Sequence, residues 1–266
     1  MKKHLQLALA ALIVAGGTVG CKQNSGTNSS LKFATIEKNL TIPLTDSTPT
    51  PACSIEVKLT YIDEETNVAK LINLTMVNNI FHYWGLTPQE AVDSFINNYA
   101  HKYKTDAGYC YKVGQENGGE EADWYNYTYI LHSQPVDDTR EGIVSFSVDC
   151  TQLASGTHGQ NTLSYLNFDR KSCALLTLDS IFASGYKEPL TDILLEALMK
   201  KKGVTSLESL KEKNYLQWHD LYPSENFLLG KDAISFLYNV YEIAPLSEGK
   251  TTLDIPYTDL TDILKQ

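Results

Sequence analysis

The hydrophobic pattern between residues 54 and 104 most constrains the fold, because it changes from the period of a strand to the period of a helix. From Ser54 to Tyr61, apolar residues alternate with polar ones, which is typical of a strand with one face in water. Thr87-Pro88-Gln89-Glu90 then has the form of a capping box with proline at the first helical position. The residues behind it predict a helix to about Lys104, with a core-facing stripe of Val92, Phe95, Ile96, Tyr99 and Tyr103.

The rest of the chain predicts groups of strands with helices between the groups. We expect strands at 124–132, 142–153, 162–168 and 173–178, helices at 189–202 and from Thr205, strands at 233–243 and 251–255, and a closing helix at 257–264. The strands after residue 124 are predicted to form an antiparallel meander. Grouping of this kind, rather than strict alternation, predicts an α+β fold with a mainly antiparallel sheet and two to four packed helices.

The amino terminus has the features of a bacterial lipoprotein signal. Lys2 and Lys3 precede an apolar run from Leu5 to Val19, and the small residue Gly20 stands directly before Cys21. The run is about 15 residues long, whereas a spanning helix needs roughly 20. This length favours cleavage over an uncleaved anchor, and an ordinary secretory signal is the other alternative. We therefore predict a signal peptide at 1–20 and lipidation of the Cys21 thiol.

The segment after Cys21 is polar and contains glycine, which predicts a flexible tether. We expect this tether to cover 21–52, because prolines continue to Pro51. The folded part is then expected at 53–266, either as one domain or as two interleaved halves at about 53–140 and 141–266. Together these segments predict a protein of the cell envelope, attached through a lipid on Cys21, with the outer membrane as its site and the periplasm or cell surface as its surroundings.

The charge of the chain argues against nucleic acid as a partner. Removal of residues 1–20 leaves 20 of the 22 Lys and Arg residues against 32 Asp and Glu residues, a net charge of −12. A surface this acidic repels phosphate backbones. A cationic partner is its natural complement.

Four cysteines remain besides Cys21, namely Cys53, Cys110, Cys150 and Cys173. An even number in an exported chain predicts two disulfides, and four cysteines allow three pairings that the sequence does not distinguish. Buried free thiols are the alternative interpretation. The spacing contains no CxxC pair, which excludes the zinc-ribbon and thioredoxin patterns.

The second half of the chain carries the residues of a recognisable pattern. The pattern consists of Gly156-Thr157-His158-Gly159, Tyr165 to Asp169, Leu176 to Phe182, Tyr241-Glu242-Ile243-Ala244-Pro245 with Gly249, and Ile255-Pro256-Tyr257. In this respect the chain resembles a domain of unknown function. That domain forms the extracellular lysozyme-sensing part of the RsiV anti-sigma factor and the non-catalytic half of PdaC-type peptidoglycan deacetylases. The resemblance covers roughly residues 53–264 and is clearest after Gly156.

The resemblance implies a binding or sensing domain whose partner is a cationic protein such as lysozyme, or else cell-wall glycan. Chemistry also gives several of these positions a role in the fold, since Pro245 and Gly249 bracket a turn and Pro256 sets the chain direction before Tyr257 packs. We nevertheless take Tyr241 and Tyr257 as candidate ligand-binding residues.

The sequence contains no recognised catalytic or cofactor motif. The catalytic half of the deacetylases needs a carboxylate and two histidines one helical turn apart, and no HxxxH or HExxH pair is present here. A GxSxG elbow, a P-loop and a dinucleotide-binding glycine signature are also missing, so no cofactor is predicted. His158 is the best single candidate for a functional side chain, because Gly156 and Gly159 let backbone and ligand approach closely. A loop-bracing histidine is the alternative.

These observations lead to one main functional prediction and one alternative. The main prediction is a non-enzymatic envelope lipoprotein with a binding or sensing domain. The alternative is a peptidoglycan-modifying hydrolase, or an accessory subunit of one, that acts on cell-wall glycan through His158. A purely structural role in the envelope is not separable from the first prediction by sequence.

Overall fold

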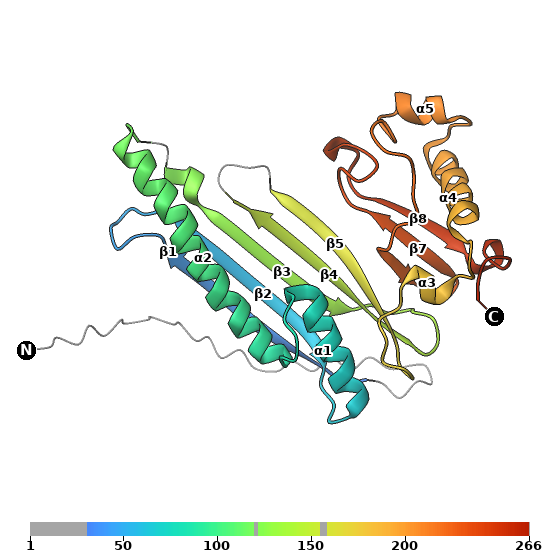
Figure 1. Ribbon diagram of the computed structural model, residues 1–266, viewed down its shortest axis with the longest axis horizontal. Coiled ribbons are helices and arrows are strands. Elements are labelled where there is room, and N and C mark those ends of the chain that lie inside the picture. The colour runs from blue at the N-terminus through green and yellow to red at the C-terminus, as the bar shows by residue number, and fades with distance from the viewer. Residues whose placement is uncertain (1–30, 120–121, 155–158, 266) are drawn as a thin grey trace, which may run out of the picture. The chain divides into compact units, whose positions relative to one another are not determined.

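The computed structural model describes residues 31–119, 122–154 and 159–265, and residues 31–266 form one compact unit. The elements of its first half surround one hydrophobic core (Figure 1). They are β1 (Phe33–Pro43), β2 (Ala52–Ile62), α1 (Asn67–Phe81), α2 (Pro88–Glu116), the 3-10 helix η1 (Ala122–Tyr125), β3 (Tyr127–Pro135), β4 (Ile143–Leu153) and β5 (Gln160–Asp169). The predicted α+β class is confirmed.

A five-stranded sheet in the order β1-β2-β3-β4-β5 is the framework of this half. β2 pairs with β3 in parallel, and the other neighbours are antiparallel. The parallel step follows from the connection, because α1 and α2 together carry the chain from β2 back to the start of β3. Both helices lie on one face of the sheet (Figure 1).

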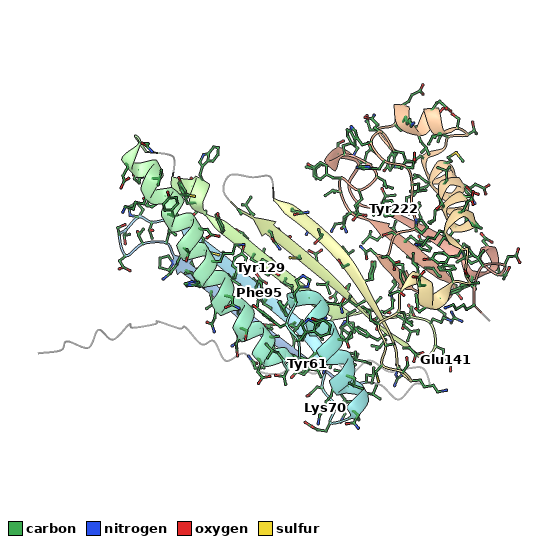
Figure 2. All side chains as sticks on the ribbon, viewed as in Figure 1. Tyr61, Lys70, Phe95, Tyr129, Glu141 and Tyr222 are labelled. Carbon is green, nitrogen blue, oxygen red and sulfur yellow. The ribbon has the colours of Figure 1, made fainter. Side chains whose placement is uncertain are left out.

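The first core joins the apolar face of the sheet to the stripe of α2. Phe95 of α2 lies 4.6 Å, between ring centroids, from Tyr129 of β3 (Figure 2). Tyr99 of α2 lies 5.0 Å from the same ring. Ring pairs at these separations add stabilisation beyond the apolar area that they bury. The capping box is formed as predicted, since the Thr87 side chain accepts from the Glu90 amide and the Glu90 carboxylate accepts from the Thr87 amide.

The second half has its own core and its own sheet. Its elements are α3 (Leu178–Ile181), α4 (Lys187–Lys202), α5 (Leu207–Glu212), β6 (Phe227–Leu229), β7 (Ala233–Tyr238), the 3-10 helix η2 (Leu246–Glu248), β8 (Thr251–Pro256) and the 3-10 helix η3 (Tyr257–Asp259). β6, β7 and β8 form a three-stranded antiparallel sheet in that order. The buried stripe of α4, formed by Leu190, Leu194 and Leu198, belongs to this second core.

Several predicted boundaries are wrong. The tether over 21–52 is contradicted from Phe33 onward, where β1 pairs with β2 along its whole length. The predicted strand at 173–178 is reduced to one bridge between Phe168 and Leu175. The closing helix at 257–264 is the short η3 followed by turns. The two cores divide between Phe168 and Leu178, not near residue 140, and they follow each other along the chain.

Within the described ranges, none of the helices has both the length and the apolar composition that crossing a membrane requires.

Asparagine side chains occupy the free edge of β5. The Leu163 amide donates to Asn239 Oδ1 at 2.8 Å, and the Tyr165 amide donates to Asn226 Oδ1 at 2.9 Å. The Leu163 carbonyl accepts from Asn226 Nδ2 at 2.7 Å and from Asn239 Nδ2 at 3.1 Å. A carboxamide offers the same donor and acceptor as a peptide group, so these two side chains stand in for a neighbouring strand.

The reverse contact runs from β5 to the free edge of β6. Asn167 is 2 % exposed, donates from Nδ2 to the Phe227 carbonyl at 2.6 Å and accepts at Oδ1 from the Leu229 amide at 3.1 Å. Ser145 of β4 donates to the same Oδ1 at 2.8 Å. The three asparagines Asn167, Asn226 and Asn239, which we call the carboxamide junction, therefore join the two sheets.

The carboxamide junction makes a stability prediction. Asn167→Ala leaves the Phe227 carbonyl and the Leu229 amide buried without their partner, and each such group costs about 1–3 kcal/mol. We expect the free energy of unfolding, measured by urea denaturation, to fall by about 3 kcal/mol. Asn79→Ala on the exposed side of α1 is the matched control and should change it by less than about 0.5 kcal/mol. An Asn167→Ala effect as small as that of the control would contradict this role.

Candidate functional site

Three of the residues singled out in the sequence, Cys21, Gly156 and His158, lie outside the described residues. Gly159 directly precedes β5. Its backbone does not have a positive φ, and a Cβ at this position would meet the Gln152 carbonyl oxygen at an ordinary 3.7 Å. The fold therefore does not itself require glycine at position 159.

Tyr241 and Tyr257 lie at opposite ends of the β7–β8 pair. Tyr241 follows the end at which Tyr238 pairs with Thr251, and Tyr257 follows the end at which Ala233 pairs with Pro256. Since a strand advances about 3.3 Å per residue, six residues separate the two ends by roughly 20 Å. One small ligand cannot contact both tyrosines.

Tyr257 is held by contacts within the fold. Its hydroxyl donates to the Gly230 carbonyl at 3.0 Å, and the Arg140 guanidinium carbon lies 5.2 Å from the centre of its ring. Burial raises the pKa of the Tyr257 hydroxyl, and nearby Arg140 opposes that shift. These contacts fasten the β3–β4 loop to the second sheet, which is a structural role.

Tyr241 instead points its ring into solvent from a strained turn. Its side chain is 59 % exposed, and its φ is 70°. The turn is tight, because the Tyr241 amide donates to the Ala244 carbonyl at 2.9 Å. A left-handed backbone costs roughly 1–2 kcal/mol for a residue with a side chain, so strain combined with an exposed ring is typical of a functional position.

Two further exposed rings lie on the segment that contacts this turn. Trp218 is 66 % exposed and Tyr222 is 42 % exposed. The Leu216 amide donates to the Ile243 carbonyl at 2.9 Å, and the Tyr222 hydroxyl donates to Glu242 Oε2 at 3.2 Å. The two segments are thus side by side, and we call Trp218, Tyr222 and Tyr241 the aromatic patch; Figure 2 labels Tyr222.

Sequence reasoning missed Trp218 and Tyr222. The sequence contains no signal that separates them from core rings, because Tyr215 stands among equally polar residues and is fully buried.

Two acidic residues belong to the segments that carry the aromatic patch. Glu242 accepts from the Tyr222 hydroxyl, and Asp220, which stands between Trp218 and Tyr222 in the sequence, is exposed. Burial raises the pKa of the Tyr222 hydroxyl, and the Glu242 carboxylate raises it further. Tyr222 therefore stays neutral at physiological pH and presents a ring beside a carboxylate.

The hairpin of β4 and β5 meets the patch end of the second sheet through a polar network. Lys250 donates to Asn161 Oδ1 and lies 3.9 Å from Asp149 Oδ2. Asn161 Nδ2 donates to Asp149 Oδ1 at 2.8 Å. This network places the start of β5, which follows Gly159, at the end of the β7–β8 pair where Tyr241 lies.

The described residues do not assemble a recognised catalytic centre. No group of three His, Cys, Asp or Glu side chains among them could hold a metal ion. One carboxylate–histidine pair lies on strands β2 and β3, with His132 Nε2 2.8 Å from Glu56 Oε1. Lys58 Nζ lies 2.8 Å from the same oxygen, and the pKa of Glu56 is lowered first by Lys58 and then by His132. Glu56 is thus held ionised, and no described hydroxyl or thiol is hydrogen-bonded to His132.

The four cysteines are free in the structure, which contains neither of the two predicted disulfides. Cys53 on β2 lies opposite Tyr127 of β3, whereas Cys150 on β4 lies opposite Leu131. Because β3 separates the two strands, their backbones are about 10 Å apart, beyond the roughly 7 Å that a disulfide can span. Cys53 is fully buried, and burial raises its pKa to about 11, while Cys110 is exposed. Cys173 lies in the turn after β5 with a φ of 61°.

Comparison with known proteins places this geometry in a family. Residues 179–258, which include the aromatic patch, match the family described as "Protein of unknown function (DUF3298)". A crystal structure of a DUF3298 member from Bacteroides fragilis is 32% identical, with a TM-score of 0.83, and covers 89% of this chain and 94% of that one. The chain belongs to the DUF3298 family. The resemblance stated from the sequence is confirmed to this extent.

Two further relatives extend the comparison. A DUF3298 structure from Pseudomonas aeruginosa shares the fold at 15% identity, with a TM-score of 0.62, over 90% of this chain and 97% of that one. The peptidoglycan-N-acetylmuramic acid deacetylase PdaC of Bacillus subtilis is 26% identical over 113 residues, which are 42% of this chain. The match with this chain spans only 24% of the length of that deacetylase.

The strained turn predicts that the fold is less stable with Tyr241 than it would be with glycine at this position. Tyr241→Gly removes the left-handed strain, and we expect the free energy of unfolding to rise by about 1 kcal/mol. Tyr109→Gly is the matched control, because this tyrosine is also exposed but lies inside α2, where glycine should lower the free energy of unfolding by about 1 kcal/mol. Thermal or urea unfolding measures both variants. A fall for Tyr241→Gly would show that the ring stabilises the fold.

Proposed function

We propose that this DUF3298 protein is a lipid-anchored module of the cell envelope that binds a cationic protein through the aromatic patch. The observation that carries the proposal is that Trp218, Tyr222 and Tyr241 are all exposed on two adjoining segments, where the Tyr222 hydroxyl is hydrogen-bonded to the Glu242 carboxylate and Asp220 is exposed. Isolated exposed rings are common on protein surfaces, whereas three exposed rings on two adjoining segments, one of them on a strained turn, are not accounted for by packing.

The chemistry of the patch suits lysine and arginine side chains. A cationic group gains from the face of a tryptophan or tyrosine ring, and a neighbouring carboxylate adds an ion pair. Tryptophan and tyrosine are also the residues in which binding energy concentrates at protein interfaces. The net charge of −12 expected for the chain after residue 20 would steer a cationic partner toward this surface.

The proposed location follows from the amino-terminal sequence. A lipid on Cys21 would hold the module at the outer membrane, facing the periplasm or the cell surface. The similarity to a peptidoglycan deacetylase supports a function close to the cell wall. A binding or sensing module there would meet proteins that attack the wall, such as lysozyme. No described constellation favours a hydrolase.

Binding to lysozyme, used as a strongly cationic probe, tests the proposed partner class. We expect residues 31–266 to bind it in isothermal titration calorimetry, with an affinity that falls as salt rises. Trp218→Ala and Tyr241→Gly should each weaken binding at least tenfold, because each removes a central ring. Trp84→Ala is the matched control, since this ring is 83% exposed in the α1–α2 loop. Absence of binding at low salt, or equal binding by all variants, would refute the proposal.

The anchor is tested separately. A fatty-acid probe fed to the native host should label the full-length protein, and Cys21→Ser should abolish the label and move the protein out of the membrane fraction. Labelling of the serine variant would locate the lipid elsewhere.

A further inference from the structure

The outer edge of the five-stranded sheet carries a further inference. β1 is the last strand in the order β1-β2-β3-β4-β5, and it is 11 residues long (Figure 1). Its inner edge pairs with β2 without interruption. The edge at the other side of the sheet belongs to β5, and the carboxamide junction completes it. Among the described residues, nothing completes the outer edge of β1 in the same way.

The register identifies the backbone groups on that outer edge. The Asp63 amide donates to the Lys32 carbonyl, and the Leu44 amide donates to the Pro51 carbonyl, both at 2.8 Å. Hydrogen-bonded and non-hydrogen-bonded pairs alternate along an antiparallel ladder, so the even-numbered residues of β1 direct their amide and carbonyl groups toward β2. The residues whose amide and carbonyl groups point outward are Phe33, Thr35, Glu37, Asn39 and Thr41.

β1 lacks the features that usually keep an edge strand from pairing with another chain. It is long, its pairing with β2 contains no bulge, and its one proline, Pro43, stands at the very end. Its one lysine, Lys38, lies 3.0 Å from Asp93 Oδ1 of α2, so its charge is balanced within the chain. An exposed edge of this length is a template for a further strand.

The charges of β1 select a register in which a second copy of the same strand fits. A two-fold axis at Glu37 would set this carboxylate opposite its own copy, and an axis at Lys38 would do the same for an ammonium group. Like charges directly opposite each other are destabilising. Of the registers that avoid both pairs, an axis at Asn39 joins the longest stretch, from Thr35 to Pro43. It also opposes odd-numbered residues to odd-numbered ones, so the outward backbone groups of both copies meet.

We propose that two copies of this chain associate through antiparallel pairing of β1 with β1, with the two-fold axis at Asn39. The two five-stranded sheets then continue into each other. This register sets the two Asn39 carboxamides opposite each other, where each can donate and accept, and it opposes Glu37 to Thr41 and Ile36 to Ile42. It forms about eight backbone hydrogen bonds, within the roughly 5–15 direct hydrogen bonds of a typical interface.

The β1 dimer does not depend on the proposed function, because β1 is separate from the aromatic patch. It goes beyond that function by placing two aromatic patches on one particle. Two linked binding sites hold a partner that offers several contacts more tightly than one site does.

Sedimentation velocity of residues 31–266, which form one compact unit, tests the association. We expect a monomer–dimer equilibrium whose dimer share rises with protein concentration into the millimolar range. Thr41→Pro removes an outward amide that β2 does not use, so it should raise the dissociation constant of the dimer at least tenfold and keep the unfolding midpoint of the monomer. Thr41→Ser is the matched control and should dimerise like the wild type. A wild-type protein that is monomeric at every concentration would overturn the proposal.

A charge at the axis gives a second test that does not alter the backbone. Asn39→Lys sets two ammonium groups opposite each other and should raise the dissociation constant at least threefold. Thr35→Lys adds the same charge to another exposed residue of β1, but opposite Pro43, and should change the dissociation constant less than twofold. Equal effects of the two lysines would overturn the register.

Cross-linking of the full chain in mild detergent tests whether the second copy, and not the chain before residue 31, occupies the edge. Opposite Cα atoms in a hydrogen-bonded pair lie about 5.5 Å apart, so Asn39→Cys should give a dimer with a short bismaleimide. The two copies of Thr35 lie roughly 26 Å apart along the strand, so Thr35→Cys should give none. Both variants carry Cys110→Ser, because Cys110 is an exposed thiol. No cross-linked dimer from Asn39→Cys, or equal cross-linking of both variants, would overturn the proposal.

Discussion

The carboxamide junction is the interaction on which the rest of the structure depends. A sheet edge exposes unpaired amide and carbonyl groups, and an edge that packs inside a protein must find partners for them. Here β5 and β6 approach each other without forming one continuous sheet, and Asn167, Asn226 and Asn239 complete both edges. Because the two cores are joined in this way, residues 31–266 form one compact unit, and the second sheet, which carries the aromatic patch, is fixed to the first.

Much of the secondary structure was predictable from hydrophobic period. β2, α4 and the antiparallel run of β3, β4 and β5 each bury one face, so their patterns identify them. β1 was missed because it is an edge strand without a fully buried residue, and its apolar signal is correspondingly weak. The carboxamide junction could not have been predicted, because the role of an asparagine there depends on which strand edge the fold brings to it.

The candidate site was predictable only in part. Tyr241 stood out because it belongs to a recognisable motif, and the structure adds the reason that its ring is exposed on a strained turn. Trp218 and Tyr222 join it only through contacts between distant segments, such as that of Leu216 with Ile243. Tyr257 belongs to the same motif but serves the fold. The role of His158 stays a prediction, because it lies outside the described residues.

Hydrogen exchange at the edge of β5 tests the central claim most directly. The amides of Leu163 and Tyr165 have asparagine side chains as their acceptors, so NMR should find both amides exchanging as slowly as paired amides in β4. In Asn226→Ala, the Tyr165 amide should become fast while the Leu163 amide, held by Asn239, stays slow. Fast exchange of both amides in the wild-type protein would show that the edge is open and that the two sheets are not joined by their carboxamides.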